Sequence, residues 1–345
     1  EPRILKGFRD FLPEQASKRA RIISTLTSTF EEFGLQPIDT PVLEYTEVLL
    51  GKGGGETDKQ VYRFEDQGGR DVSMRFDLTV PFARFMAQHE HELPVPFKRY
   101  HIDKVWRGEN TQRGRYREFT QCDFDIVGTD NASADFEILL LMYRSFAALG
   151  IDDVTIKINH RGIFNRFLSH IGVDNESVEI MRLIDKRGKI GTEKVREGLA
   201  DLVGEGKAEK ILSYIDAGGS YREILDHITS LAGGEDEDSG RLSAIESAMR
   251  ELGIEDRFEL DPSIMRGLDY YTGIVYETFL DRIPEIGSVC SGGRYNNLAS
   301  LYSKTELPGV GSSIGLDRLI AALDELEEGG ATERGADVAV FNLDD

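Results

Sequence analysis

Two long alternating segments joined by a short polar loop constrain the fold of this chain more than any other feature. Residues 97–107 (FKRYHIDKVWR) and 117–128 (REFTQCDFDIVG) are both predicted to be strands, and GENTQRGRY joins them. A short connection of this kind joins antiparallel neighbours, because parallel strands need a longer crossover. Further strands are expected at residues 37–41, 61–66, 71–79, 154–160, 273–280 and 288–297. Because most of them follow one another through hairpins, the sequence predicts an α+β fold with a mainly antiparallel sheet flanked by helices.

Helices are predicted before, between and after these strands. Residues 14–33 place their apolar side chains near one stripe, and Gly34 occupies the position of a C-cap glycine. Residues 133–150 form a second helix, with Ser133 as its N-cap and Gly150 as its end. The last strand, in VGSSIGLDRLIAALDEL, runs directly into a third helix.

The character of the chain changes after its first 160 residues. Residues 161–255 carry mostly short helical patterns, interrupted by GGSY and by the acidic GGEDEDSG. They are predicted to be a helical insertion domain between two parts of one core, at 1–160 and 256–330. Residues 331–345, with GADVAVFNLDD, are expected to be a linker and the start of a truncated further domain.

Composition places the chain among globular proteins of the cytoplasm. It has 345 residues, 40% of them apolar, and a net charge of −21, which suggests about two domains. No apolar run approaches the roughly 20 residues that span a bilayer, and no signal sequence is evident at the N-terminus. Cys122 and Cys290 stand alone in the sequence and are expected to be reduced, buried thiols.

The charge of one stretch opposes that of the whole chain. Residues 98–117 hold seven basic residues against two acidic ones, a local net charge of +5. A charge run is most often a solvated face, but this local excess favours an anionic ligand. Four arginines are predicted at strand ends or in loops, where the planar guanidinium can bind two phosphate oxygens at once. They are Arg107, Arg115, Arg266 and Arg318.

Hydrogen-bond acceptors accompany these arginines. Gln121 and Asp125 are four residues apart on a predicted strand and therefore share a face, and Asp77 and Thr79 are expected to share a face of another strand. The alternative for such pairs is the solvent face of a half-buried strand. The glycine cluster at 51–59 lacks the GxxxxGK[ST] order and is predicted to be a surface loop. GxSxG and HExxH motifs are absent and the histidines are scattered, so hydrolase and zinc-enzyme interpretations are weak.

Several motifs of this chain resemble those of the histidyl-tRNA synthetases, which are class II aminoacyl-tRNA synthetases. RGLDYYTG and SGGRYNN (266–273 and 291–297) resemble the two histidine-specific signatures of that family. The three class II motifs are present as FGLQPIDTPVLE, VWRGENTQRGRYREFTQCDFDIVG and PGVGSSIGLDRL (33–44, 105–128 and 308–319). The resemblance covers nearly the whole chain but not most of the family's C-terminal anticodon-binding domain.

The resemblance implies an enzyme that joins L-histidine to ATP, forming histidyl adenylate and pyrophosphate. The histidine would then pass to the 3′ end of tRNA(His), and Mg²⁺ would accompany the ATP, although the sequence does not identify its ligands. A homodimer formed through the first motif is also implied. By motif match, Arg107 would hold the α-phosphate and the histidine carboxylate, and Arg266 would add a second charge at the reacting centre. The implied ATP-binding residues are Arg107, Glu109, Arg115 and Arg318.

The same motif match implies a histidine pocket. Asp77 and Thr79 would hold the α-amino group, while Gln121 would orient the amino acid. Asp125 and Tyr271 would each bind one ring nitrogen, because a neutral imidazole offers one donor and one acceptor. The full implied set is Asp77, Leu78, Thr79, Arg107, Gln121, Asp125, Arg266, Tyr270, Tyr271 and Tyr295.

Two other classes of protein share this core and remain as alternatives. One is the synthetase-like regulatory subunit of ATP phosphoribosyltransferase, which binds histidine without catalysis and lacks an anticodon-binding domain. A non-catalytic relative does not need to keep phosphate-binding arginines, so the four arginines favour the enzyme. The other is the synthetase-like domain of a regulatory kinase, and no kinase motif is present in this chain.

Overall fold

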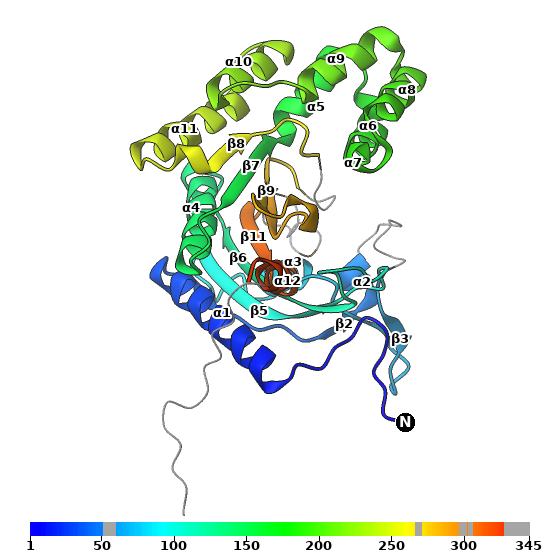
Figure 1. The fold of residues 1–345 in the computed structure, drawn as a ribbon, viewed down its shortest axis with the longest axis vertical. Helices are drawn as coiled ribbons and strands as arrows, with labels where there is room; N and C mark the ends of the chain where they lie inside the picture. The colour runs from blue at the N-terminus through cyan, green and yellow to red at the C-terminus, as the bar shows by residue number, and fades with distance from the viewer. Residues whose placement is uncertain (51–59, 266–270, 297–301, 303–305, 328–345) are drawn as a thin grey trace, which may run out of the picture.

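The computed structural model describes residues 1–50, 60–265, 271–296, 302 and 306–327. Within these residues, two sheets form from the strands β1 (Gln36–Pro37), β2 (Leu43–Tyr45), β3 (Arg63–Glu65), β4 (Asp71–Met74), β5 (Phe97–Trp106), β6 (Glu118–Val127), β7 (Val154–His160), β8 (Phe258–Leu260), β9 (Ile274–Leu280), β10 (Cys290–Tyr295) and β11 (Gly309–Gly315). The larger sheet has the order β1-β5-β6-β11-β10-β9-β7-β8, and the smaller one has the order β2-β4-β3 (Figure 1). Among the described strands, only the two outermost pairs of the large sheet are parallel. The predicted antiparallel α+β arrangement is confirmed.

Helices surround the large sheet. The described ones are α1 (Pro13–Glu32), α2 (Thr46–Leu50), α3 (Thr79–Gln88), α4 (Ala132–Ala148), α5 (Arg161–His170), α6 (Ser177–Asp185), α7 (Arg187–Ile190), α8 (Thr192–Val203), α9 (Glu205–Ile215), α10 (Tyr221–Leu231), α11 (Glu237–Glu251) and α12 (Leu316–Glu327). Figure 1 shows α1 and α4 along the outer side of the curved sheet. None of the described helices is long and apolar enough to cross a membrane.

The apolar stripe of α1 packs into the main core, as its spacing predicts. Leu26 and Phe30 have no exposed surface, and the Phe30 ring lies 4.9 Å from that of Phe124 on β6. Burial of each such side chain stabilises the fold by about 1.5–3 kcal/mol. The helix ends before Gly34, whose φ of 76° is readily adopted by glycine. The two cysteines are buried and free, as expected.

Helix α4 begins slightly earlier than predicted. Its N-cap is Asn131 and not Ser133, because the Asn131 side chain accepts a hydrogen bond from the Ser133 backbone N–H. Asparagine is at least as good an N-cap as serine. The predicted end is confirmed, since Gly150 has a φ of 72°.

Helices α5 to α11 occupy the region predicted to be helical. Figure 1 shows them as an arc at the top of the molecule. Helix α11 packs against α4 as well as against α5 and α10, so the apolar core continues from the sheet into this helical segment, residues 161–251. The division of the chain into domains at residues 160 and 255 remains a prediction, and the start of a further domain expected at 331–345 lies outside the described residues.

The strand predicted at residues 71–79 is wrong in its second half. Strand β4 ends at Met74, and α3 begins at Thr79. Asp77 Oδ1 accepts a hydrogen bond from the Val80 N–H at 3.0 Å, so this carboxylate caps the helix. Asp77 and Thr79 therefore do not share a strand face. The strand expected at 37–41 is likewise shorter, because β1 ends at Pro37.

Candidate functional site

The predicted phosphate-binding side chains lie together in one pocket of about 280 Å³, called here the arginine pocket. It is formed by the loop between β5 and β6, the strands β9, β10 and β11, and the start of α12. Its polar lining includes Arg107, Glu109, Arg115, Gln121, Glu277, Ser291, Ser313, Asp317 and Arg318. All four predicted ATP-binding residues are therefore brought together. Arg266, predicted to join them, lies outside the described residues.

Arg107 is fixed at the end of β5 by the backbone. Its Nε donates to the carbonyl oxygen of Phe76 at 2.8 Å, and its guanidinium lies 5.1 Å from the centre of the Phe119 ring. The Glu109 carboxylate lies 4.0 Å from Arg107 and 3.6 Å from Arg115. These two arginines can bind an anion in the pocket while the carboxylate between them holds their orientation.

Arg318 was expected at a strand end or in a loop, but it lies in the first turn of α12. It donates to the carbonyl oxygen of Ser288 at 2.5 Å. Burial, together with the nearby Arg115, lowers the pKa of Arg318 to about 10, so the guanidinium remains charged at neutral pH. Gly114 allows the loop to approach this side chain, because a Cβ there would lie 3.2 Å from Arg318 Cγ and its φ is +68°.

Asp317 is a structural residue of this pocket that the motif reasoning did not assign. Its carboxylate is 3% exposed, pairs with Arg9 and with Arg19, and accepts from the Thr120 N–H at 2.7 Å. It thereby ties the N-terminal segment, β6 and α12 together beside Arg318. The signal available in the sequence was the arginine of KGFRDFLP, which needs an acidic partner where it becomes buried.

Next to the arginine pocket, a carboxylate cluster of Asp77, Asp123 and Asp125 is almost fully buried. Arg99 on β5 has no exposed surface and lies 2.8 Å from the Asp125 carboxylate and 3.9 Å from that of Asp123. Its guanidinium also lies 4.2 Å from the centre of the Phe82 ring. The guanidinium of Arg99 therefore compensates the negative charge of both Asp123 and Asp125 in part.

Burial has a clear effect on the acids of this cluster. It raises the pKa of Asp123 to about 7, although Arg99 opposes the rise. It raises the pKa of Asp77 to about 6, opposed by the helix-capping hydrogen bond and by Arg107. The second oxygen of Asp77, Oδ2, is buried and has no hydrogen-bond partner. An incoming ammonium group would satisfy such an acceptor and stabilise its charge.

The strand geometry predicted for β6 is confirmed. Gln121, Asp123 and Asp125 alternate along this continuous strand, so they share a face. Asp123 and Arg99 were missed by the motif reasoning. The alternation at 121, 123 and 125 was a signal for Asp123, whereas the pairing of Arg99 with Asp125 depends on the register of β5 on β6.

Tyr295 closes the carboxylate cluster. Its hydroxyl donates to Asp125 Oδ1 at 2.5 Å, and its side chain packs beside Tyr271. Gly293 permits this packing, because a Cβ there would lie 2.9 Å from the Tyr271 ring. Among the other predicted histidine-binding residues, Leu78 is fully buried and Gln121 donates to the Ser313 hydroxyl at 2.9 Å. Tyr270 lies outside the described residues.

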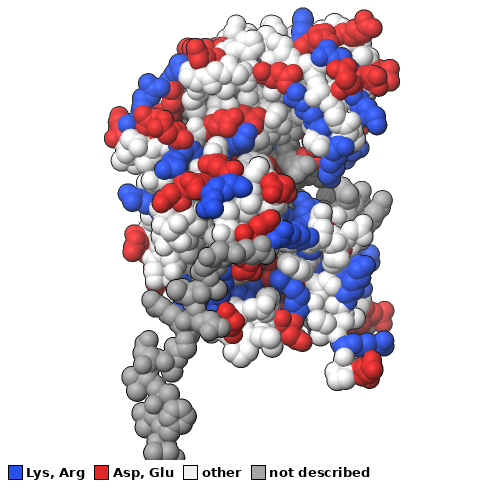
Figure 2. Space-filling view, in the orientation of Figure 1, with Lys and Arg blue, Asp and Glu red and all other residues white. Residues whose placement is uncertain are grey.

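A second cavity, of about 880 Å³, lies between α6–α7 and the strands β7 to β9. Figure 2 shows this side of the molecule hollowed below the helices. Lys157 and Arg187 line the cavity together with several acidic residues, including Asp261 and Glu277. Its mixed charge favours no particular ligand, but Glu277 also lines the arginine pocket.

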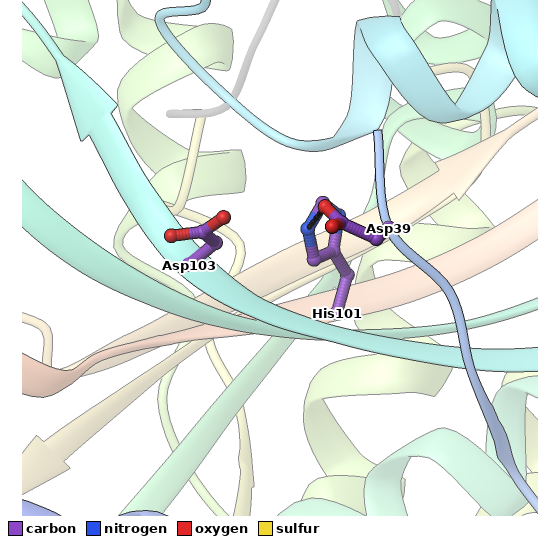
Figure 3. A group of neighbouring side chains, drawn as sticks. All are labelled: Asp39, His101 and Asp103. Atoms are coloured by element: carbon purple, nitrogen blue, oxygen red, sulfur yellow. Dashed lines mark ion pairs between the residues drawn. The ribbon is translucent and has the colours of Figure 1, made fainter. Parts of the chain in front are cut away.

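One further group of described residues has the chemistry of metal ligands. Asp39, His101 and Asp103 bring an imidazole and two carboxylates to within 4.8 Å of one another (Figure 3). However, Asp103 already pairs with Arg75 at 2.5 Å. Burial, Arg99 and Arg75 lower the pKa of His101 to about 3. Burial is the main cause that keeps this imidazole neutral. The positive charge of Arg99 and Arg75 opposes a divalent cation at this place, and we assign no metal to the group.

Comparisons with known proteins agree with this geometry. The family model described as histidyl-tRNA synthetase matches residues 7–319. The histidine–tRNA ligase of Treponema denticola is 53% identical over 99% of this chain and 78% of its own length, and that of Treponema pallidum is 50% identical over 94% and 75%. The crystal structure of histidyl-tRNA synthetase from Nostoc sp. PCC 7120 matches with a TM-score of 0.84 and 34% identity, over 94% of this chain and 75% of the other. This chain therefore belongs to the histidyl-tRNA synthetase family.

Proposed function

We propose that this chain activates L-histidine with ATP and then transfers the histidyl group to the 3′ end of tRNA(His). The observation that carries the proposal is the convergence of Arg107, Arg115 and Arg318 in one pocket that adjoins the buried carboxylate cluster. Three guanidinium groups suit a triphosphate, and buried carboxylates suit an ammonium group and a ring N–H. ATP supplies the triphosphate that the arginines would bind, and histidine supplies the ammonium group and the ring N–H that the carboxylates would bind.

In the first step, the histidine carboxylate attacks the α-phosphate of ATP and pyrophosphate leaves. Two anions must approach each other, so cations held in place in advance lower the barrier. Arg107 would bind both the carboxylate and the α-phosphate, and Arg266 would add a second charge there. Arg115 and Arg318 would bind the outer phosphates, with Arg318 also facing the adenine.

The arginine pocket also offers ligands that fit Mg²⁺. Glu109 and Glu277 place carboxylates in its lining. Protein-bound Mg²⁺ is usually held by one or two carboxylates together with substrate phosphates and water. Because Glu109 also pairs with Arg107 and Arg115, these side chains would hold the ion only together with the ATP phosphates, whose negative charge outweighs the arginines and would be partly neutralised by the ion.

The carboxylate cluster would recognise the amino acid. Asp77, through its unpartnered Oδ2, would bind the α-amino group together with Thr79. Asp125 accepts from Tyr295 and pairs with Arg99. A carboxylate has about four lone-pair sites, so it can still accept the ring N–H of histidine. Tyr271 would bind the other ring nitrogen.

The site of dimerisation and the cellular location also belong to the proposal. Val42 and Leu43, within the first class II motif, and Tyr45, directly after it, are 37%, 44% and 50% exposed. Exposed apolar side chains that lie together favour a protein interface, so we propose that two copies associate through this motif. We further propose a cytoplasmic location, where tRNA charging takes place.

Rapid-quench analysis with labelled histidine, ATP and tRNA(His) tests the two chemical steps separately. We expect histidyl adenylate to form first and charged tRNA to follow, and we expect Arg107→Ala to remove both products. The alternative function, that of a histidine-binding regulatory subunit, predicts neither product. A solved structure described as an ATP phosphoribosyltransferase regulatory subunit/histidyl-tRNA synthetase from Bacillus halodurans is 24% identical, with a TM-score of 0.81. At that identity it supports only the shared fold.

A further inference from the structure

A group of four charged side chains, three of them largely buried and the fourth, Asp130, with 49% of its side chain exposed, connects the strand that carries Tyr295 to the helical segment. We call it the Asp135 cluster: Asp135 on α4, Arg294 on β10, Arg241 on α11 and Asp130 before α4. Asp135 has no exposed surface and accepts from Arg294 Nε at 2.8 Å and from Arg241 at 2.7 Å. Arg294 is 2% exposed and Arg241 has 9% of its side chain exposed.

The cluster is balanced in charge and closed by short contacts. Asp130 lies 3.2 Å from Arg294 and 3.1 Å from Arg241, and its backbone oxygen accepts from Arg241 at 2.9 Å. Two cations therefore meet two anions. Removing one member of such a group leaves a buried charge without its partner, so the remaining side chains must rearrange.

On one side, the cluster reaches the residues proposed to bind the imidazole. Arg294 directly precedes Tyr295, whose hydroxyl donates to Asp125. The Arg294 backbone oxygen accepts from the Thr272 N–H at 2.8 Å. A Cβ on Gly273 would lie 3.2 Å from the Arg294 side chain, so this arginine also packs closely on the segment that follows Tyr271.

On the other side, the cluster reaches the helical segment. Arg241 lies in α11. The neighbouring helix α5 contacts the segment from Tyr271 to Gly273, which borders the carboxylate cluster. Arg161, the first residue of α5, donates through its guanidinium to the Tyr271 carbonyl oxygen at 2.9 Å and through its backbone N–H to that of Gly273 at 3.0 Å. Helix α5 thus contacts the segment of Tyr271 directly, and α11 is linked to β10, which carries Tyr295, through Asp135 on α4.

We infer that Arg241 is a positioning residue for histidine: through Asp135 and Arg294 it makes α11 part of the frame that holds Tyr271 and Tyr295. This inference rests on the proposed function only in naming histidine as the ligand of that pocket. Its consequence is that a displacement of α11 relative to α4 changes the affinity for histidine. Arg107, Arg115 and Arg318, the phosphate-binding arginines in the described part of the chain, form none of their hydrogen bonds or ion pairs with this cluster, so ATP affinity should stay unchanged.

The test compares Arg241→Gln and Arg241→Lys with a control from the same helical segment. Arg222→Gln breaks an ion pair of 2.5 Å between α10 and Glu246 on α11, in which no member of the Asp135 cluster takes part. For each full-length variant, histidine binding is measured by titration calorimetry, and ATP KM by histidine-dependent ATP–pyrophosphate exchange. We expect Arg241→Gln to weaken histidine binding about tenfold, the size of a typical coupling between sites, with ATP KM within twofold of the parent. Arg241→Lys should recover part of the loss and Arg222→Gln should show none.

Unchanged histidine affinity in Arg241→Gln, or an equal effect on histidine and ATP, overturns the inference. If Arg241→Gln does not fold, Arg241→Lys decides: the Lys variant is expected to bind histidine more weakly than Arg222→Gln does, and equal affinities overturn the inference. The calorimetric arm does not depend on catalysis. Absence of exchange in the parent chain would therefore contradict the proposed function and leave the test of Arg241 intact.

Discussion

Replacing Asp123 by asparagine tests the electrostatic account of the carboxylate cluster. Asp123 is 1% exposed, and burial raises its pKa to about 7 despite Arg99. Arg99 forms its closer ion pair with Asp125, at 2.8 Å against 3.9 Å for Asp123. The ionised form of Asp123 is therefore poorly compensated, and its ionisation destabilises the folded state.

The sign and size of the effect follow from the difference in proton affinity. Because the pKa is higher in the folded protein, the contribution of Asp123 to stability is present at low pH and is lost as the pH rises through the folded pKa. The change from 3.8 to about 7 corresponds to roughly 4 kcal/mol, at about 1.4 kcal/mol for each tenfold change in affinity. About 2 kcal/mol of this is lost between pH 5.5 and pH 8 and the rest at lower pH. Asparagine does not titrate, so the Asp123→Asn variant should keep its stability as the pH rises. Its free energy of unfolding, relative to that of the parent, should therefore rise by about 2 kcal/mol between pH 5.5 and pH 8.

Urea unfolding at pH 5.5 and pH 8 measures this difference. Trp106, the one tryptophan of the chain, is 6% exposed and its fluorescence reports loss of the core. Equal slopes of the unfolding free energy against urea for parent and variant show that the folded and unfolded states are comparable. Asp153→Asn, at an exposed position, is the matched control and should show no gain. The reasoning would be refuted if Asp123→Asn changed the free energy of unfolding equally at both pH values, or if it destabilised the protein more at pH 8 than at pH 5.5.

Three further substitutions test the proposed site. Tyr295→Phe removes the hydrogen bond to the Asp125 carboxylate and should weaken histidine binding about tenfold by calorimetry, as expected for a bond to a charged acceptor; an unchanged Kd contradicts this. Arg318→Gln should raise the KM for ATP by about tenfold or more in ATP–pyrophosphate exchange without changing the Kd for histidine, and a change confined to histidine would argue against its phosphate role. Arg266→Ala should abolish adenylate formation while histidine binding remains measurable, and unchanged turnover would remove it from the mechanism.

Much of the fold follows from local patterns in the sequence. The strands β5 and β6 were predictable because both alternate over ten residues and a short polar loop joins them. Helices α1 and α4 were predictable from apolar spacing and from glycines placed where a positive φ ends a helix. Helix α3 was missed, because its short sequence TVPFARFMAQ begins soon after β4 ends at Met74 and its cap, Asp77, resembled a strand residue.

The candidate site was predictable only where a motif placed its residues in one segment. Arg107, Glu109, Arg115 and Gln121 belong to one motif and line one pocket. Partnerships between distant segments did not follow from the sequence. The pairing of Arg99 with Asp125 depends on strand register, and the role of Asp317 depends on how the N-terminal segment crosses α12. Three-dimensional packing, not residue type, brings these charges together.

ATP–pyrophosphate exchange with each of the 20 amino acids supplied singly tests the central claim most directly. The account predicts exchange with histidine alone. The arginine pocket would bind ATP and stabilise the transition state, while the carboxylate cluster and its tyrosines would select the amino acid. Absence of exchange with every amino acid, while calorimetry shows that histidine binds, would contradict the account and favour a regulatory, histidine-binding protein.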